Sequence, residues 1–245
     1  MIKYQTFLKD NEVFDLKLKP NIVCIGFFDG LHKMHKKIFN KTKKIAKEEQ
    51  MIWSIITFSE KVSDFLKGVK SSLESRNRKY QNIEKNYLPD YLFEINVNNE
   101  SIKLTANQFC LFLKDKLNVK KVVVGDDFRF GYKGEGKVSD LQNFFGIDNI
   151  IVFKRVSNIS TSLIKENLAK GEIKKVNSII DENFTTTFKK TGEKLFLIED
   201  YNIVIGNGQY LVVINGKTSQ IQLENNAVIL DNKEEILDIE FLKKV

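Results

Sequence analysis

Cysteine, histidine, proline and tryptophan are all scarce in this chain. Its 245 residues include two cysteines, two histidines, two prolines and one tryptophan. Cys24 lies in an apolar run and Cys110 in a helical pattern, which argues against a disulfide scaffold and indicates a reduced, cytoplasmic protein. Neither cysteine has a metal-ligand spacing and there is no third histidine, so we expect no metal site formed by the protein itself.

Long apolar segments are missing as well. No run approaches the ~20 apolar residues that a membrane-spanning helix needs, and the first residues, MIKYQT, are too polar for a signal segment. We therefore expect no membrane partner. Hydrophobic residues still make up 42% of the chain, which suffices for one large packed domain or a domain with a small appendage.

Arginine is rare although the chain is basic. The net charge is +7, but only four of the 39 basic residues are arginine: Arg76, Arg78, Arg129 and Arg155. The excess fits anionic ligands, yet a lysine-rich composition with solvated side chains explains it more simply. The lysines of segment 34–50 therefore indicate a solvated helix face, and we expect no nucleic-acid partner.

Apolar runs of strand length alternate with segments of helical spacing up to about residue 183. This order predicts an α/β fold with a doubly wound, mainly parallel sheet. Ligands of such sheets bind beyond the carboxyl ends of the strands, here 26–35, 57–59, 125–136 and 157–162. A short edge element is expected within residues 1–20. The expected strands are 21–25, 52–58, 91–97, 120–124 and 150–153, and the expected helices lie within 34–50, 61–88, 106–117 (capped by Thr105), 141–145, 160–171 and 173–180.

The pattern changes after residue 183 to short apolar runs broken by turn residues. Gly206–Gly208, Asn215-Gly216 and Asn225-Asn226 are typical of tight turns. The sequence predicts a small antiparallel β domain over residues 184–245, after a larger domain over residues 1–183. The expected strands are 184–189, 195–198, 202–205, 209–214, 220–223, 227–230 and 236–241.

Both histidines lie in one segment, NIVCIGFFDGLHKMHKK, over residues 21–37. It has the pattern of a buried strand, a glycine-containing turn and the start of a basic helix, where backbone N–H groups and the helix dipole favour a phosphate. His32 and His35 share one face of that helix start. No serine or cysteine nucleophile is paired with them, so their expected role is to stabilise phosphate charge.

Gly26-Phe-Phe-Asp-Gly-Leu-His-Lys-Met-His35 resembles the G-x-F-D-G-x-H-x-G-H signature of the bacterial FAD synthetase family. That resemblance implies a Rossmann-like nucleotidyltransferase fold. Met34 departs from the signature, because the family has glycine between the two histidines. The resemblance implies ATP binding by Gly26, Phe27, Phe28, Asp29, Gly30, His32 and His35.

A second segment is more specific to that family. Val124-Gly-Asp-Asp-Phe-Arg-Phe-Gly131, with Gly136 following, resembles V-G-x-D-F-R-F-G-x4-G. Its rings can bracket a flat tricycle, and its guanidinium can bind phosphate or stack. Thr57-Phe58 resembles the start of the T-F-D-P-H-P loop, whose remainder is absent. The resemblance implies flavin binding by Thr57, Phe58, Gly125, Asp127, Phe128, Arg129, Phe130 and Gly131.

A third segment, Ile159-Ser-Thr-Ser-Leu-Ile-Lys165, resembles the phosphate-binding motif I-S-S-T-x-I-R. The hydroxyls are kept, but Lys165 replaces arginine and loses its two-pronged geometry. The resemblance implies that Ser160, Thr161, Ser162 and Lys165 bind ATP phosphates, with Lys165, His32 and His35 as the catalytic residues.

Together these segments imply an enzyme that makes FAD and pyrophosphate from FMN and ATP, with Mg²⁺ bound through the nucleotide. The family's riboflavin kinase signature, P-T-A-N, cannot occur because the only prolines are Pro20 and Pro89. We interpret residues 184–245 as a degenerate remnant of a riboflavin kinase-like barrel. Another nucleotidyltransferase of the cytidylyltransferase type, or a non-catalytic flavin or nucleotide-binding protein, remains an alternative.

Overall fold

The computed structural model describes residues 1–6, 8, 17–198, 203–230 and 234–245, which form two compact units. The first unit comprises residues 1–28, 34–69 and 76–155, and the second comprises residues 29–33, 70–75 and 156–245. The chain therefore crosses from one unit to the other inside the segment that holds both histidines. The predicted domain boundary between residues 183 and 184 stays a prediction.

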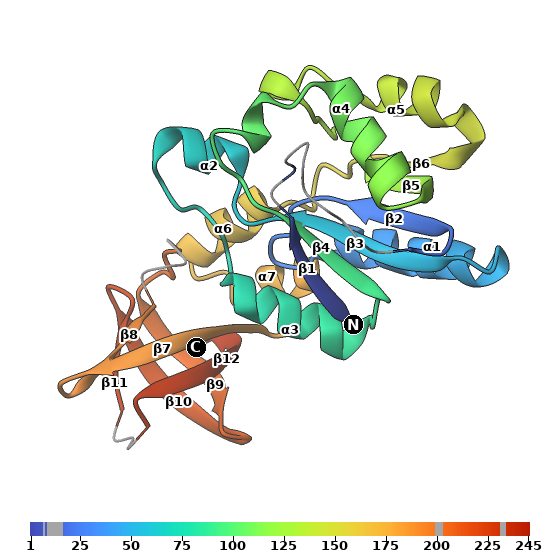
Figure 1. The fold of residues 1–245 in the computed structure, drawn as a ribbon. Coiled ribbons are helices and arrows are strands. Elements are labelled where there is room, and N and C mark those ends of the chain that lie inside the picture. Colours follow the sequence, from blue (N-terminus) through green and yellow to red (C-terminus); the bar gives the residue numbers. More distant parts are fainter. Residues whose placement is uncertain (7, 9–16, 199–202, 231–233) are drawn as a thin grey trace. The chain divides into compact units, whose positions relative to one another are not determined.

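A six-stranded parallel sheet forms the centre of the first unit (Figure 1). The strand order is β1-β4-β3-β2-β5-β6. From β2 the chain adds β3 and β4 on one side and then β5 and β6 on the other side, as in a doubly wound fold. This confirms the predicted α/β class and the edge element at the start of the chain. The strands are β1 (Ile2–Thr6), β2 (Asn21–Ile25), β3 (Ile52–Phe58), β4 (Tyr91–Ile95), β5 (Val119–Gly125) and β6 (Ile150–Phe153).

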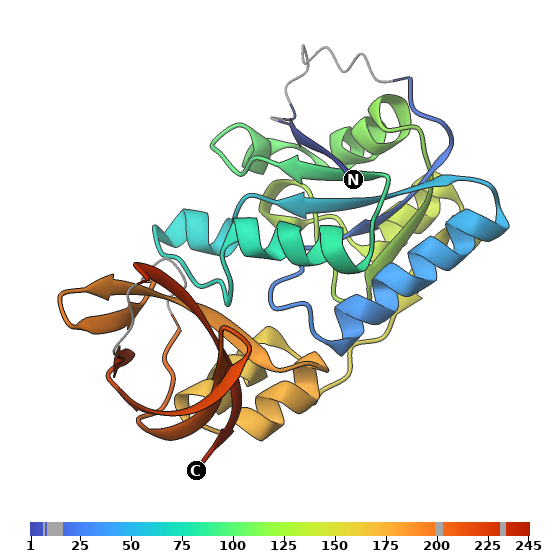
Figure 2. The same cartoon turned by 90° about the horizontal axis from the view of Figure 1, so that it is seen from below.

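Helices cover both faces of this sheet (Figures 1 and 2). Every residue of β2 is buried, which is expected for a central parallel strand with two covered faces. One face packs against α1 (Lys33–Glu48) and α3 (Arg76–Asn86). The other packs against α4 (Ala106–Leu111), the π-helix η2 (Phe112–Lys116) and α5 (Val138–Phe145), while α2 (Val62–Lys67) follows β3. Short 3₁₀ turns occur at Ser101–Lys103, Tyr132–Gly134 and Ile147–Asn149.

Helix α4 begins at the predicted cap. The Thr105 hydroxyl accepts a hydrogen bond from the backbone N–H of Gln108 at 3.2 Å, and the Gln108 side chain accepts one from the Thr105 N–H at 2.9 Å. These bonds satisfy donors that a helix start leaves open. The predicted single helix over 106–117 is interrupted, because it widens into the π-helix at Phe112.

Two helices and a closed antiparallel barrel form the second unit, which confirms the predicted C-terminal β architecture. The Asn215-Gly216 and Asn225-Asn226 pairs have positive φ, as the tight turns between these strands require. The elements are α6 (Thr161–Ala169), α7 (Ile173–Ile180), β7 (Phe184–Thr191), β8 (Lys194–Leu197), β9 (Gly208–Ile214), β10 (Lys217–Glu224), β11 (Ala227–Ile229) and β12 (Ile236–Lys244).

The strand expected over residues 202–205 is wrong for residues 203–205, and Asn202 lies outside the described residues. Ile203 and Ile205 are buried, as the alternating pattern indicates, but their backbone groups bind a side chain instead of a neighbouring strand. The Asn226 amide donates to the Ile203 carbonyl at 2.8 Å and accepts from the Ile205 N–H at 2.9 Å. The Asn226 side chain therefore takes the backbone hydrogen bonds that a neighbouring strand would otherwise make with Ile203 and Ile205.

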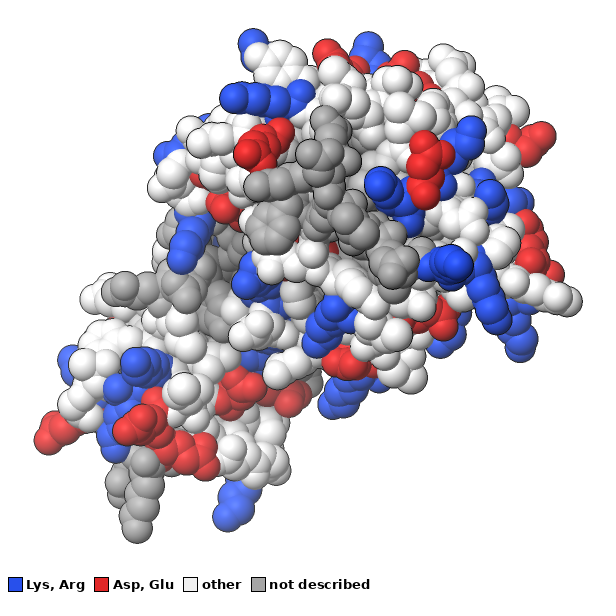
Figure 3. Space-filling view, in the orientation of Figure 1, with Lys and Arg blue, Asp and Glu red and all other residues white. Residues whose placement is uncertain are grey.

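Cys24 and Cys110 are both buried and free. Across the described ranges, no helix combines the length and the apolar character that crossing a bilayer demands. Lysine and arginine side chains alternate with acidic ones over the face shown in Figure 3.

Candidate active site

The loop after β2 has an unusual backbone. Phe28, Gly30 and Leu31 have φ values of 52°, 72° and 26°, all in the left-handed region. Such a conformation is ordinary for glycine but costs free energy at phenylalanine and leucine, and it concentrates at functional loops. Inverted backbone of this kind also turns peptide N–H groups toward an anion.

In the first unit, two side chains hold the Phe27 carbonyl. The Lys79 ammonium donates to it at 2.9 Å and the Thr57 hydroxyl donates to it at 3.2 Å. Lys79 also donates to Thr57 Oγ1 at 3.3 Å and lies 4.2 Å from the centre of the Phe27 ring. The loop is thus fixed from the adjacent strand β3 and from helix α3.

The ring of Phe28 connects this loop to His35. Phe28 is buried and meets the His35 ring edge-on, with ring centres 5.3 Å apart. It also packs against Phe39 at 4.7 Å. His35 therefore has an aromatic support on the first turn of α1. Met34, beside it, is half-buried and helical, so its backbone does not require glycine.

A buried polar cluster lies beside Thr57. Glu94 pairs with Thr57 across β3 and β4, accepts from Arg76 at 3.2 Å and accepts a short hydrogen bond from the Tyr80 hydroxyl. Burial and the neighbouring Glu94 carboxylate raise the pKa of Tyr80, so its hydroxyl stays a proton donor at neutral pH. Helix α3 thus supports this edge of the sheet through Lys79 and Tyr80.

In the second unit, Asp29 and Gly30 are held by neighbouring chain segments. The Asp29 carboxylate accepts from the Leu73 N–H at 2.8 Å, and the Asp29 carbonyl accepts from the Thr161 hydroxyl at 3.2 Å. The Gly30 N–H donates to Glu74 at 3.1 Å. A Cβ on Gly30 would lie 2.6 Å from Leu73 Cδ1, and its φ of 72° lies in the left-handed region, so both the packing and the backbone favour glycine here.

Helix α6 presents its N-terminus in the same unit. The Ser160 hydroxyl caps the helix by accepting from the Leu163 N–H at 3.2 Å, and Ser162 is exposed. The Lys165 ammonium donates a short hydrogen bond to the Ser71 carbonyl. The other histidine, His32, also belongs to this unit and is 7% exposed.

The loop Gly125–Gly136 begins at the end of β5. Phe128 is half-buried and stacks on Phe130, with ring centres 5.6 Å apart at an angle of 15°. Phe130 is buried in the core, 5.3 Å from Phe109, whereas Arg129 is exposed. Of the two rings in this motif, Phe128 is therefore the more accessible to a ligand and Phe130 supports it from the core side.

Hydrogen bonds and close packing explain the glycines of this loop. Phe130 and Gly136 exchange two backbone hydrogen bonds, of 3.2 Å and 2.9 Å. A Cβ on Gly136 would lie 2.9 Å from the Phe130 ring. Gly131 has φ of 74°, and a Cβ there would lie 2.6 Å from the Ala106 nitrogen. Beside Gly125, Asp127 is exposed and paired with Arg155 at 3.2 Å.

The structure brings the sequence-predicted residues together in two groups. The first unit joins Thr57 to the Gly26–Phe28 loop, and His35 to Phe28. Phe58 packs on the same core as Phe128. The second unit joins Asp29 to Thr161 and holds Gly30 beside Glu74.

Sequence reasoning missed Lys79, Tyr80, Glu94 and the 71–74 segment. Charged residues such as Lys79 and Glu94 are normally assigned to the surface, and none of the motifs includes Tyr80 or segment 71–74, so nothing in the spacing marked them.

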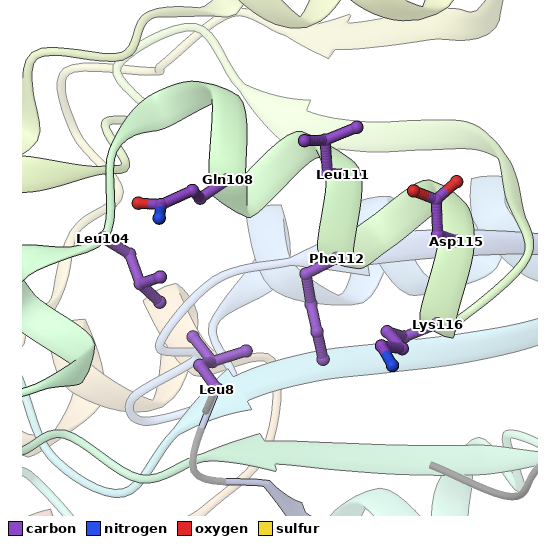
Figure 4. Close-up of a pocket in the computed structure, with 7 residues that line it drawn as sticks. All are labelled: Leu8, Leu104, Gln108, Leu111, Phe112, Asp115 and Lys116. Atoms are coloured by element: carbon purple, nitrogen blue, oxygen red, sulfur yellow. The ribbon is translucent and has the colours of Figure 1, made fainter. Parts of the chain in front are cut away.

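A separate small pocket of about 170 Å³ lies between α4, the π-helix and Leu8 (Figure 4). It is lined by the apolar side chains of Leu8, Leu104, Leu111 and Phe112 and by the polar side chains of Gln108, Asp115 and Lys116. Among the residues that the structure describes, no three His, Cys, Asp or Glu side chains form a cluster that could hold a metal ion.

Comparison with known proteins identifies the family. A sequence model of FAD synthetase matches residues 15–160. The chain is 30% identical to a bifunctional riboflavin kinase/FMN adenylyltransferase of Buchnera aphidicola, over 79% of this chain and 68% of that protein. A Listeria monocytogenes protein of the same name is 26% identical, and the chain spans only 55% of its length.

Two further proteins match along nearly the whole chain. An FAD synthetase of Listeria monocytogenes is 24% identical, over 92% of this chain and 99% of that protein. The crystal structure of a macrolide-efflux protein from Streptococcus pneumoniae superposes with a TM-score of 0.82, covers 100% of both chains and is 20% identical, which shows the shared fold. Because the family model matches more than half of the sequence, this chain belongs to the FAD synthetase family.

Proposed function

We propose that the two groups of residues described above carry out FMN adenylyltransfer, in which FMN and ATP give FAD and pyrophosphate. The observation that carries this function is the family match over residues 15–160, which spans the histidine segment and the Val124–Gly131 segment together. The FAD synthetase from Listeria, similar along 99% of its length, supports the same activity.

The chemistry needs no protein nucleophile. A phosphate oxygen of FMN attacks the α-phosphorus of ATP, the new P–O bond forms, and the bond to the β-phosphate oxygen breaks to release pyrophosphate. The protein has to orient the two phosphates and stabilise the charge that develops between them. We assign the donors to these oxygens to His32, which directly precedes α1, and to His35, on the first turn of α1.

The β- and γ-phosphates are assigned to the second unit. The N-terminus of α6, with Ser160, Thr161 and Ser162, offers hydroxyl and backbone donors and the positive end of a helix dipole. Lys165 would exchange the Ser71 carbonyl for a phosphate oxygen when ATP binds. Asp29 and Gly30 shape the adjoining loop.

The flavin is assigned to the first unit. Phe128 offers a half-buried ring for stacking, and the exposed Arg129 can bind the FMN phosphate or stack. Gly26, Phe27 and Phe28 would seat the nucleotide. Further flavin contacts are assigned to Thr57, Phe58, Gly125, Asp127, Phe130 and Gly131.

Mg²⁺ would enter with ATP, held by phosphate oxygens and water. The residues described fit this arrangement, since nearby donors such as Lys165 and the α6 N-terminus suit anions rather than a bare cation. When bound, the ion would neutralise phosphate charge. We assign no riboflavin kinase activity to the barrel and place the enzyme in the cytoplasm.

The assay that tests this function follows FAD by chromatography after mixing the full chain with FMN and Mg-ATP. We expect FAD and pyrophosphate in equal amounts, and no FMN when riboflavin replaces FMN. A protein that binds FMN or ATP but makes no FAD would contradict the assignment. If the protein makes no FAD but transfers the cytidylyl group of CTP to another alcohol phosphate, the result would favour a cytidylyltransferase.

The role of His32 is tested by His32→Ala and His32→Asn. We expect kcat to fall on the order of 10²-fold or more, because a donor to the transition-state charge is lost. The matched control is Lys37→Ala, an exposed residue of α1, which should keep the full rate. Unchanged kcat in both folded His32 variants would remove this residue from the mechanism.

A further inference from the structure

Lys79 is a buried charge with a defined target. Its side chain is 4% exposed, although lysine is among the residue types least often buried. The ammonium donates to the Phe27 carbonyl at 2.9 Å and to Thr57 Oγ1 at 3.3 Å, and lies over the Phe27 ring. Burying an ammonium costs free energy unless such partners replace water, so its position is specific.

The carbonyl that Lys79 binds controls the next residue. The Phe27 C=O and the Phe28 N–H belong to one planar peptide group, so holding the oxygen constrains rotation of this plane about the Phe28 N–Cα bond, which defines φ. Phe28 is held at φ of 52°, a conformation that phenylalanine rarely adopts. Such backbone persists only where surrounding contacts enforce it. Lys79 and Thr57 supply those contacts on the carbonyl side.

The conformation of Phe28 in turn places a ring against His35. With this backbone, the buried Phe28 ring packs against Phe39 and against His35, each in a T-shaped arrangement. Rotating the Phe27–Phe28 peptide would move the ring and remove the support of the imidazole. All of these residues belong to the first unit, so the chain of contacts from α3 to α1 is complete within it.

We propose that Lys79 is a positioning residue for His35, acting through the Phe27 carbonyl and the left-handed backbone of Phe28. Lys79 does not contact the substrates in this role. Its kinetic consequence rests on the proposed function, whereas its effect on the His35 ring does not. None of the three sequence motifs contains this residue.

Lys79→Met tests the proposal, because it keeps the length of the side chain and removes the donors. We expect kcat for FAD formation to fall on the order of 10- to 100-fold, since small misplacements of a reacting group have effects of this size. Lys85→Met, an exposed lysine of the same helix, is the matched control and should keep the full rate. Lys79→Arg, which keeps the charge and donors, should recover part of the loss.

A double-mutant cycle separates positioning from loss of folded protein. In a His35→Ala background, Lys79→Met should cause little further loss of kcat, because the group it positions is gone. If Lys79→Met instead lowered the rate through a general loss of stability, the losses caused by Lys79→Met and His35→Ala would multiply in the double variant. Independent losses of kcat in folded variants would overturn the proposal.

The imidazole can also be observed without any activity. His32 and His35 are the only histidines, so a ¹H–¹³C spectrum of the side chains contains two sets of ring signals, which His32→Asn assigns. Lys79→Met should shift the His35 signals and Lys85→Met should not. If the wild type makes no FAD, the proposed function fails while this measurement still decides the positioning role. Unmoved His35 signals in folded Lys79→Met would overturn it.

Discussion

Cys110 shows how burial of a single residue makes stability depend on pH. Its thiol is buried on α4, and burial together with the negative charge of Asp140 raises its pKa from 9.0 to about 11. The unfolded chain therefore releases this proton first as the pH rises. Because the native state prefers the protonated thiol, the contribution of Cys110 to the free energy of unfolding is fully present below pH 9. It is lost between pH 9 and about pH 11.

We therefore expect the free energy of unfolding to fall by on the order of 2 kcal/mol over that pH range through Cys110. Urea unfolding of the wild type and of Cys110→Ala at pH 8 to 10.5 measures the difference. The variant should be less stable at pH 8, and the gap should narrow as the pH rises. Parallel pH curves for the two proteins would show that the Cys110 thiol has the same pKa in the folded and the unfolded state, which contradicts the prediction.

Single buried polar residues are also where the sequence is least informative. Glu94 interrupts an otherwise apolar strand, and Lys79 stands in a helix rich in charge. Both are buried because specific partners on other elements satisfy them: Arg76 and Tyr80 for Glu94, and the Phe27 carbonyl for Lys79. Those partners depend on tertiary structure, which no local pattern encodes.

At the scale of elements, apolar runs predict the sheet well. Strands β2, β3 and β6 and helix α7 have the expected bounds. In β2 every residue is buried, and such continuous burial leaves a continuous apolar signal. The failure at residues 203–205 has a different cause. Buried alternation is present, but the Asn226 side chain takes the backbone hydrogen bonds that a strand would need. Periodicity reports burial and does not report the hydrogen-bond partner.

The motif loop after β5 gives a prediction at the same scale. Gly131→Ala adds a Cβ 2.6 Å from the Ala106 backbone at φ of 74°. We expect a loss of stability above the roughly 1 kcal/mol of the left-handed conformation alone, together with a raised KM for FMN as Phe128 and Arg129 shift. Thermal unfolding and FAD-formation kinetics measure the two effects.

The control for that variant is Gly68→Ala. Gly68 has a similar φ of 63°, but a Cβ there meets nothing within 4 Å. It should show the conformational cost alone and leave the KM for FMN unchanged. Equal effects of the two substitutions on stability and KM would mean that the close packing of Gly131 has no part in shaping the loop.

At the scale of the whole molecule, the boundary between residues 183 and 184 stays a prediction, and the packing of helices α6 and α7 suggests how to test it. Helices α6 and α7 share one hydrophobic core with the barrel, including Ile164, Val176 and Phe241. Asn177 of α7 also donates to the Phe241 carbonyl at 2.9 Å and accepts from the Phe184 N–H at 2.8 Å. The helix assigned to ATP phosphates therefore depends on barrel residues for its burial.

We accordingly expect a fragment of residues 1–183 to lose ATP binding more than FMN binding. Without the barrel, the apolar faces of α6 and α7 are exposed, and the N-terminus of α6 no longer holds Ser160 and Lys165 in place. Calorimetric titration of each ligand compares the fragment with the full chain. In the full chain, Phe241→Ala should weaken ATP binding in the same direction, because it removes a buried ring from the shared core at a cost of about 3–5 kcal/mol. A fragment with full ATP affinity would show that the helices fold without the barrel and that the boundary at residue 183 separates independent domains.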